Sequence, residues 1–162
     1  ISLVQGAACG GGFSLALASD VRIAAEDARM NAAYIKIGLT GCDMGSSYFL
    51  PRLVGASVAS ELLMTGRFIH APRALAVGLV SEVVARDGLE AAAQLLVGDM
   101  LLTAPMGLRL TKEALNFSVD APSLDAAMAM EDRHQSLLAL TEDAGEAALS
   151  FFEKRAPHYR NR

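Results

Sequence analysis

A run of three glycines, Gly10 to Gly12, follows a short strand-like segment and opens a helix-like one. Glycine lets the backbone adopt unusual dihedral angles and lets another molecule approach the main chain closely. The first N–H groups of a helix have no partner inside the helix, and they favour a negative charge. A thioester carbonyl gains such a charge as it becomes an enolate, so donors at this turn would stabilise the enolate selectively. The run therefore indicates an oxyanion hole.

Two other uses of a glycine run leave specific signs that this segment lacks. A phosphate-binding loop would continue into Gly-Lys-Ser/Thr, and a dinucleotide-binding loop would show the spacing Gly-x-Gly-x-x-Gly. The segment from Cys9 to Phe13 contains neither pattern. A tight strand-to-helix turn that binds no ligand is the alternative that three glycines alone leave open.

The elements that must position these glycines alternate between strands and helices up to about residue 87. Apolar segments separated by turn signals favour parallel βαβ-like units and an α/β fold. We expect strands at 1–5, 20–25 and 79–85, a turn at 27–31, a glycine-rich loop at 38–45, and helices at 13–19, 44–53, 56–65 and 71–77.

From Gly88 onward the apolar spacing is helical throughout. We expect helices at 89–102, 105–117, 123–140 and 141–154. Pro105 and Pro122 stand where new helices should begin, and Glu142 places an acid in the first turn of the last one. The chain therefore divides into an α/β part, residues 1–87, and a helical part, residues 88–162.

Composition excludes several classes of function. The chain of 162 residues carries a net charge of −4 with acids and bases interspersed, which argues against nucleic acid or a membrane surface as the partner. Cys9 and Cys42, with three scattered histidines, show neither disulfide nor zinc-site spacing, and we expect both cysteines to be small buried residues. Unpaired thiols fit a cytoplasmic location.

The segments around the glycine run resemble a known family. The run VQGAACGGGFSLA at residues 4–16, followed by SDVRIA at 19–24, is similar to the signature of the enoyl-CoA hydratase/isomerase (crotonase) superfamily. Shorter family motifs recur at Gly38-Leu39, Leu63-x-Thr65-Gly66, Ala76-x-Gly78-Leu79-Val80 and residues 152–157. The resemblance runs from Ile1 to about Tyr159 and is to the C-terminal portion of the family. Because the chain opens inside a buried-strand pattern, we expect an N-terminal portion to be missing.

The resemblance implies a fold, a substrate and an assembly. The family's fold is a spiral of ββα turns followed by a C-terminal helical trimerisation region. The resemblance implies an acyl-CoA substrate, no cofactor apart from the coenzyme A that is part of the substrate, no metal, and a homotrimer or a hexamer formed as a dimer of trimers. By the same resemblance, Gly11 supplies one N–H of the oxyanion hole, and the family's N-terminal half supplies the other.

The family's hydratases hold their water with two glutamates, and those positions are Ser14 and Tyr34 here. Neither side chain is a base near neutral pH, since tyrosine's reference pKa is ~10 and this serine has no partner base. We therefore do not expect standard hydration of a 2-enoyl-CoA. Dienoyl-CoA isomerases of the superfamily carry an aspartate in a similar Gly-Leu stretch, one residue shorter than here. That resemblance implies that Asp43 moves a proton; alternatively, Asp43 only caps the helix at 44–53.

The remaining candidate site residues are substrate-binding ones: Gly10, Ser14, Tyr34, Gly41 and Lys154. Tyr34 either hydrogen-bonds ligand or water or merely packs. Lys154 either contacts CoA phosphates of a neighbouring subunit, as its region does in related proteins, or favours the dipole of its helix. Two functions stay open: an acyl-CoA enzyme with isomerase or unusual lyase chemistry, and a non-catalytic acyl-CoA-binding protein of the same fold.

Overall fold

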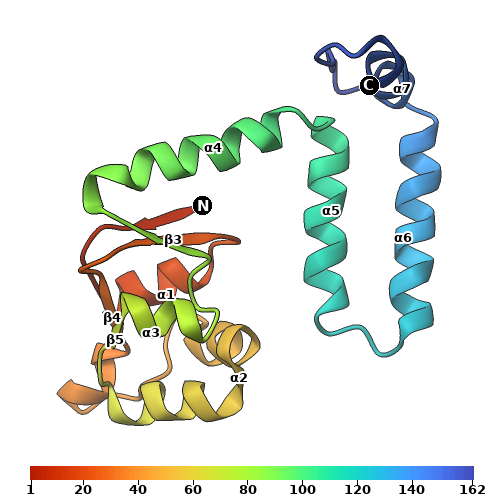
Figure 1. Ribbon diagram of the computed structural model, residues 1–162. Coiled ribbons are helices and arrows are strands. Elements are labelled where there is room, and N and C mark those ends of the chain that lie inside the picture. Colours follow the sequence, from red (N-terminus) through yellow and green to blue (C-terminus); the bar gives the residue numbers. More distant parts are fainter. The chain divides into compact units, whose positions relative to one another are not determined.

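The computed structural model describes every residue from Ile1 to Arg162. The chain forms two compact units, Ile1–Leu95 and Leu96–Arg162. The division falls inside helix α4 (Leu89–Leu101), C-terminal to the predicted boundary between residues 87 and 88. Strands occur only in the first unit, and the second is entirely helical apart from its turns and tail (Figure 1).

Six short strands of the first unit form two three-stranded sheets. They are β1 (Ser2–Val4), β2 (Ala7–Cys9), β3 (Arg22–Ala25), β4 (Arg29–Asn31), β5 (Ile69–His70) and β6 (Glu82–Val84). One sheet has the order β1-β3-β6 and is entirely parallel. In the other, β4 pairs with β2 in parallel and with β5 in antiparallel fashion. Parallel neighbours need a crossover, and α1 (Gly11–Leu17) lies in the connection from β1 to β3 and in the connection from β2 to β4.

The strands predicted at 1–5, 20–25 and 79–85 are confirmed as β1, β3 and β6, but the turn predicted at 27–31 is wrong in part. Arg29–Asn31 is a strand, and Met30 and Asn31 are buried in it. Its partner β2 is not predicted either. Neither AAC in β2 nor RMN in β4 contains a β-branched or aromatic residue, so neither segment shows the composition of a strand.

The longest helix of the first unit, α2 (Ser46–Thr65), consists of two helical segments. Gly55 separates them with φ 77° and ψ 162°, as the predicted pair of helices requires. Gly66 ends the second segment at φ 58°, and its N–H donates to the Leu62 carbonyl at 2.9 Å. The first segment begins at Ser46, later than the predicted start at residue 44. The other helices of this unit, besides α1 and the start of α4, are α3 (Ala71–Ala76) and the 3-10 helices η1 (Ala33–Ile37) and η2 (Arg86–Gly88).

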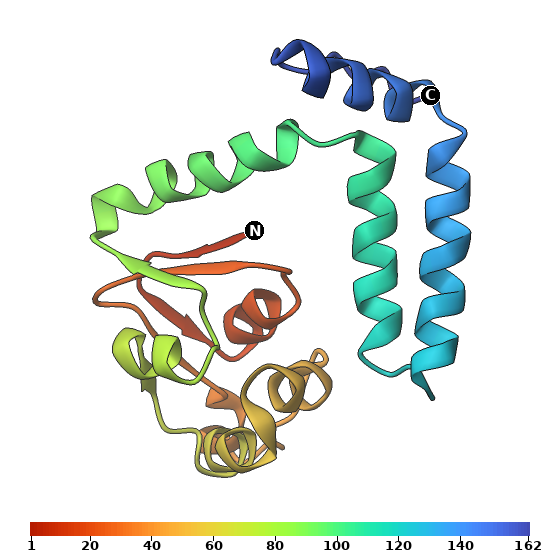
Figure 2. The same cartoon turned by 45° about the vertical axis from the view of Figure 1, so that its right-hand side comes forward.

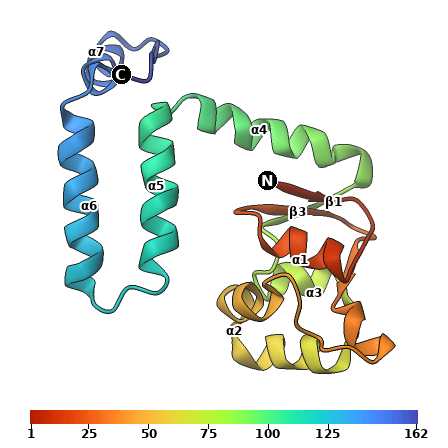
Figure 3. The same cartoon turned by 180° about the vertical axis from the view of Figure 1, so that it is seen from behind.

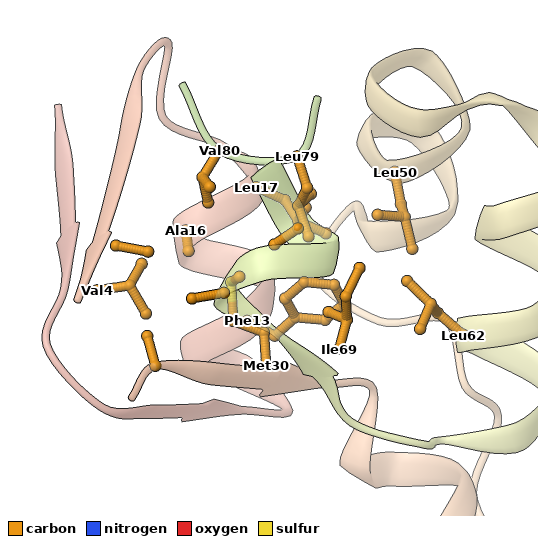
Figure 4. Close-up of a cluster of buried hydrophobic side chains, with 14 of the residues drawn as sticks. Val4, Phe13, Ala16, Leu17, Met30, Leu50, Leu62, Ile69, Leu79 and Val80 are labelled. Carbon is orange, nitrogen blue, oxygen red and sulfur yellow. The ribbon is translucent and has the colours of Figure 1, made fainter. Parts of the chain in front are cut away.

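A single apolar core holds the first unit together. Phe13 and Leu17 of α1 are buried with Met30, Leu62 and Ile69, and Figure 4 shows these side chains gathered around Phe13. Burying a side chain of this size contributes roughly 1.5–3 kcal/mol. Because Phe13 follows the glycine run directly, the same packing fixes the start of α1.

The second unit contains α5 (Pro105–Ser118), α6 (Leu124–Ala139) and α7 (Glu142–Glu153), all predicted from helical spacing. Their caps follow from residue type: Ser123 accepts from the Ala126 N–H at 3.1 Å and Thr141 from the Ala144 N–H at 3.2 Å. Helices α5 and α6 lie side by side in every view (Figures 1, 2 and 3). No single helix of the chain has the length and apolarity to cross a membrane, and only a bent pair, Arg86–Leu101 with Pro105–Ser118, reaches the threshold by length and composition.

Candidate functional site

Gly10 makes the sharp turn between β2 and α1. Its φ of 53° with ψ of −120° is a conformation that side chains disfavour, and a Cβ there would lie 3.3 Å from the Tyr34 ring. The Gly10 N–H donates to the Asn31 carbonyl at 3.0 Å. This amide already has a hydrogen-bond acceptor inside the protein, so it is not free to bind a substrate. The contribution of Gly10 to the site is the turn itself.

Gly11 is the first residue of α1 and is only partly buried. Its N–H makes no hydrogen bond in the structure, because it is one of the donors that a helix start leaves without an internal acceptor. A Cβ added at Gly11 would lie 3.4 Å from Met44 Sδ and 3.6 Å from the Tyr34 hydroxyl. The unused amide thus lies at a half-buried position beside a phenol and a thioether.

Tyr34 belongs to η1, and its hydroxyl donates to Met44 Sδ at 3.8 Å. A thioether is a weak acceptor, so this phenol keeps most of its capacity to bind another oxygen. Met44 is half exposed and has a φ of 48°, which is uncommon for a residue with a side chain. Met44 is not among the predicted site residues, because a left-handed backbone at an ordinary residue leaves no signal in the sequence.

Asp43 lies on the exposed stretch between η1 and α2, and its main chain is held on both sides. Ser14 Oγ donates to the Asp43 carbonyl at 3.0 Å, and the Asp43 N–H donates to Ser46 Oγ at 3.1 Å. The Ser46 N–H also donates to the Asp43 carbonyl, at 3.0 Å. The carboxylate accepts only the adjacent Met44 N–H, at 2.9 Å through Oδ1.

The alternative in which Asp43 caps a helix at 44–53 is wrong. Helix α2 begins at Ser46, and its N-cap is Gly45 with φ 83° and no side-chain capping bond. The Asp43 side chain bonds the N–H of the next residue instead of one inside the helix. Ser46 is the second residue that the sequence analysis misses. The pattern Asp-x-x-Ser just before a helix, which resembles half of a capping box, is a signal that could have found it.

Arg22 fixes the other end of α1. Its guanidinium is buried and donates to the carbonyls of Leu79 at 2.7 Å, Ala16 and Leu17 at 3.4 Å, and Ser19. Burial lowers the pKa of Arg22, whereas the charge of Asp20 raises it. These bonds satisfy carbonyls at the C-terminal end of the helix that begins with Gly11, so they help to set its direction.

The structure brings five of the predicted residues together and leaves two apart. Hydrogen bonds and close approaches join Gly10, Gly11, Ser14, Tyr34 and Asp43. Gly41 is buried at the base of the Asp43 stretch, where a Cβ would come within 2.0 Å of the Leu63 carbonyl oxygen. Lys154 is exposed in the second unit at φ 54°, just past the end of α7.

The cysteines and other potential metal ligands do not add to this site. Cys9 and Cys42 are free and exposed, so the prediction that both are buried is wrong. Cys9 ends β2 and Cys42 lies on the Asp43 stretch, both at surface turns beside glycines. No group of three His, Cys, Asp or Glu side chains is arranged to hold a metal ion.

An open cavity of about 520 Å³ adjoins the first turn of α1. Gly12 and Ala16 line it from the helix, residues 2–8 from β1, β2 and the turn between them, and Arg86 from the 3-10 helix that follows β6. Gly11, Ser14, Tyr34 and Asp43 do not line this cavity, so it is separate from the group of candidate residues.

Comparison with known proteins points to one family over the whole chain. The profile of the family described as Enoyl-CoA hydratase/isomerase matches residues 1–162. The probable enoyl-CoA hydratase EchA12 of Mycobacterium tuberculosis is 41% identical over 158 residues, which are 97% of this chain and 55% of that protein. A probable enoyl-CoA hydratase/isomerase from Mycobacterium abscessus superposes with a TM-score of 0.90 at 40% identity, covering 98% of this chain and 61% of that one. The enoyl-CoA hydratase of Bacillus anthracis gives 0.92 at 34% identity, covering 99% and 62%.

These matches confirm the predicted α/β fold with its ββα core and C-terminal helices. The chain spans little more than half the length of the curated relatives that it matches first. What the whole protein does is accordingly a matter for proposal.

Proposed function

Because the chain belongs to the enoyl-CoA hydratase/isomerase family, we propose that it acts on an acyl-CoA thioester and stabilises the enolate formed from it. The observation that carries the proposal is the unused N–H of Gly11 at a half-buried turn. A donor aimed at an oxygen that gains charge lowers the barrier, and losing one such donor typically costs roughly 2.7–4 kcal/mol.

Asp43 is the proposed base. In a 3-enoyl-CoA, its carboxylate removes a proton from the carbon alpha to the thioester, and the negative charge moves to the oxygen bound by Gly11. The same proton returns at the gamma carbon, so the double bond moves by one position and nothing is gained or lost. Support comes from the position of Asp43, whose main chain contacts Ser14 and whose neighbour Met44 contacts Tyr34 beside Gly11.

Tyr34, Gly10 and Gly41 shape the substrate pocket in this proposal. The Tyr34 hydroxyl, which has only a thioether as acceptor, donates a hydrogen bond to the bound substrate or its water. Gly10 and Gly41 permit the close backbone approaches that hold the turn and the Asp43 stretch in place.

Several relatives carry the name hydratase, and hydration of a 2-enoyl-CoA needs a base that activates water. Ser14 cannot serve, because its hydroxyl is buried and donates to a backbone carbonyl. We therefore expect isomerisation to be faster than hydration in this protein.

The test is turnover of a panel of 3-enoyl-, dienoyl-, 2-enoyl- and 3-hydroxyacyl-CoA by the full-length protein. Replacing Asp43 with Asn should slow isomerisation at least ~100-fold, because general bases typically contribute 10²–10⁴-fold. Asp87→Asn is the matched control, since Asp87 is also exposed and lies in the same unit. Equal rates for wild type and Asp43→Asn would remove Asp43 from the mechanism.

A second candidate is a non-catalytic acyl-CoA-binding protein of the same fold. It is favoured by Ser14 and Tyr34, which stand where the family's hydratases carry acids. Tight binding with no turnover on any member of the panel would establish the binder and contradict the enzyme.

We further propose a homotrimer, or a hexamer of two trimers, assembled through the second unit. Large apolar side chains on its helices are exposed, among them Leu124, Leu140, Phe151 and Phe152. Clusters of exposed apolar side chains mark interaction surfaces. In this assembly Lys154 contacts CoA phosphates of a neighbouring subunit, so Lys154→Ala should raise KM for acyl-CoA with little effect on kcat.

A further inference from the structure

Two buried serines meet at one exposed aspartate. Ser14 and Ser46 are 1% and 0% exposed, whereas Asp43 lies on a stretch of four consecutive exposed residues, 42–45. The Ser14 hydroxyl donates to the Asp43 carbonyl, and the Ser46 hydroxyl accepts from the Asp43 N–H. The main chain of Asp43 is thus tied at its carbonyl and at its amide to side chains that belong to the core.

The residues that follow Asp43 have an unusual backbone. Met44 and Gly45 both have left-handed backbones, with φ of 48° and 83°. A left-handed conformation at a residue with a side chain is unfavourable and persists only where surrounding contacts impose it. At Gly45 the carbonyl accepts the N–H groups of Tyr48 and Phe49, and at Met44 the side chain accepts the Tyr34 hydroxyl. At Asp43 the side-chain bonds from outside the residue come from Ser14 and Ser46.

Helix α1 connects this arrangement to the oxyanion donor. Gly11 and Ser14 are three residues apart on the same helix, so they lie on neighbouring positions of one turn. The turn that presents the free Gly11 N–H therefore also binds the peptide group of Asp43. A rigid element that carries both groups sets the distance between them.

We propose that Ser14 and Ser46 are positioning residues that hold the Asp43 main chain and so place its carboxylate relative to the Gly11 amide. The proposal rests on the proposed role of Asp43 as the base. The carboxylate keeps one oxygen, Oδ2, without a partner in the structure, while the peptide group carries the restraint. Ser14 thereby takes a supporting role in place of the substrate contact that the sequence suggests.

The experiment compares kcat and KM for 3-enoyl-CoA isomerisation by the full-length protein and five variants: Ser14→Ala, Ser14→Cys, Ser46→Ala, Asp43→Asn and the double variant Ser14→Ala/Asp43→Asn. Misplacing a catalytic group by about 1 Å can cost ~100-fold. We expect each serine variant to lower kcat about 10- to 100-fold with KM nearly unchanged, and the double variant to be no slower than Asp43→Asn alone. Ser14→Cys keeps the side-chain volume, so it serves if the alanine variant folds poorly.

Ser19→Ala is the matched control. The Ser19 hydroxyl also donates to a backbone carbonyl, that of Ala16 at 2.8 Å, but at the opposite end of α1. It should lower thermal stability as Ser14→Ala does and leave kcat unchanged.

The outcomes separate the two proposals. If Asp43→Asn is slow but Ser14→Ala and Ser46→Ala keep the wild-type kcat, the positioning role of the two serines is wrong. The role of Asp43 as the base is then still supported. The positioning role is equally wrong if Ser14→Ala slows the Asp43→Asn protein by the same factor as the wild type, since Ser14 would then act independently of Asp43. If Asp43→Asn is as fast as the wild type, the base itself is wrong and the positioning role falls with it.

Discussion

The two units of the chain differ in whether they bury apolar side chains. Every buried apolar residue lies between Val4 and Leu89, in the first unit, whereas the buried residues of the second unit are His134, Asp143 and Ser150. The tail of the second unit is held by polar bonds: the Asp143 carboxylate accepts the N–H groups of Arg160 at 2.7 Å and Asn161 at 2.8 Å. The first unit therefore has a core of its own, and the second consists of well-capped helices with exposed apolar faces.

This difference suggests that the first unit holds the site and the second mediates assembly. A site that must hold an amide and a carboxylate in register needs close packing around it, and the first unit supplies that packing under α1. Helices that expose leucine and phenylalanine need a partner to cover them, which fits the proposed assembly.

Truncating a core side chain of the first unit should be the most damaging change. Leu62 is fully buried, so Leu62→Ala should lower the free energy of unfolding by about 2–5 kcal/mol in a urea titration. Leu115 in α5 is 64% exposed, and Leu115→Ala should cost less than about 1 kcal/mol at a protein concentration low enough to prevent association. Equal losses would mean that the second unit has an apolar core after all.

Replacing Arg22 should cause the next-largest loss of stability. Arg22→Met keeps much of the side-chain volume but leaves four carbonyls without their donor, and we expect a loss of about 3 kcal/mol in the free energy of unfolding. Arg22→Lys retains the charge and loses the planar fork, so it should fall between Arg22→Met and the wild type. Wild-type stability for Arg22→Met would show that these bonds do not fix α1.

Charges placed on the exposed apolar faces should act on assembly and not on folding. Phe152 is 81% exposed, and Phe152→Asp should weaken self-association at least about tenfold, or ~1.4 kcal/mol, as measured by sedimentation. Met64 of α2 is 76% exposed in the first unit, and Met64→Asp is the control that should leave association unchanged. The opposite pattern would place the interface on the first unit.

Removing one surface ion pair should have the smallest effect on the free energy of unfolding, and this effect should be similar in both units. Hydrogen bonds from Arg73 lower the pKa of Glu61 from 4.5 to about 2, and those from Arg155 do the same for Glu146. Because the folded pKa is depressed, each pair contributes stability above pH 4.5 that is lost as the pH falls from 4.5 toward about 2. Glu61→Gln and Glu146→Gln should each flatten the dependence of unfolding on pH in this range. Both pairs are at the surface, so the change should be small.

The sequence predicts the second unit better than the site. Capping residues such as Ser123 and Thr141 mark helix starts locally, so the helical part can be predicted almost residue by residue. Strands β2 and β4 escape prediction because they contain no β-branched or aromatic residue and gain their stability from pairing. The Gly11 turn is predictable from its glycines. The bond between Ser14 and Asp43 joins residues 29 positions apart, and a pattern of neighbouring residues cannot reveal such a contact.

The Gly11 amide is tested most directly by removing its hydrogen while keeping the helix. Proline is well tolerated at the first position of a helix, so Gly11→Pro removes the N–H at the position where the fold can best accept it. Gly11→Ala is the matched control, because a Cβ there meets only ordinary contacts at 3.4 and 3.6 Å and the N–H is kept. We predict that Gly11→Pro lowers kcat for 3-enoyl-CoA isomerisation about 10²–10³-fold relative to Gly11→Ala. Equal kcat values for the two folded variants would contradict enolate stabilisation by this amide.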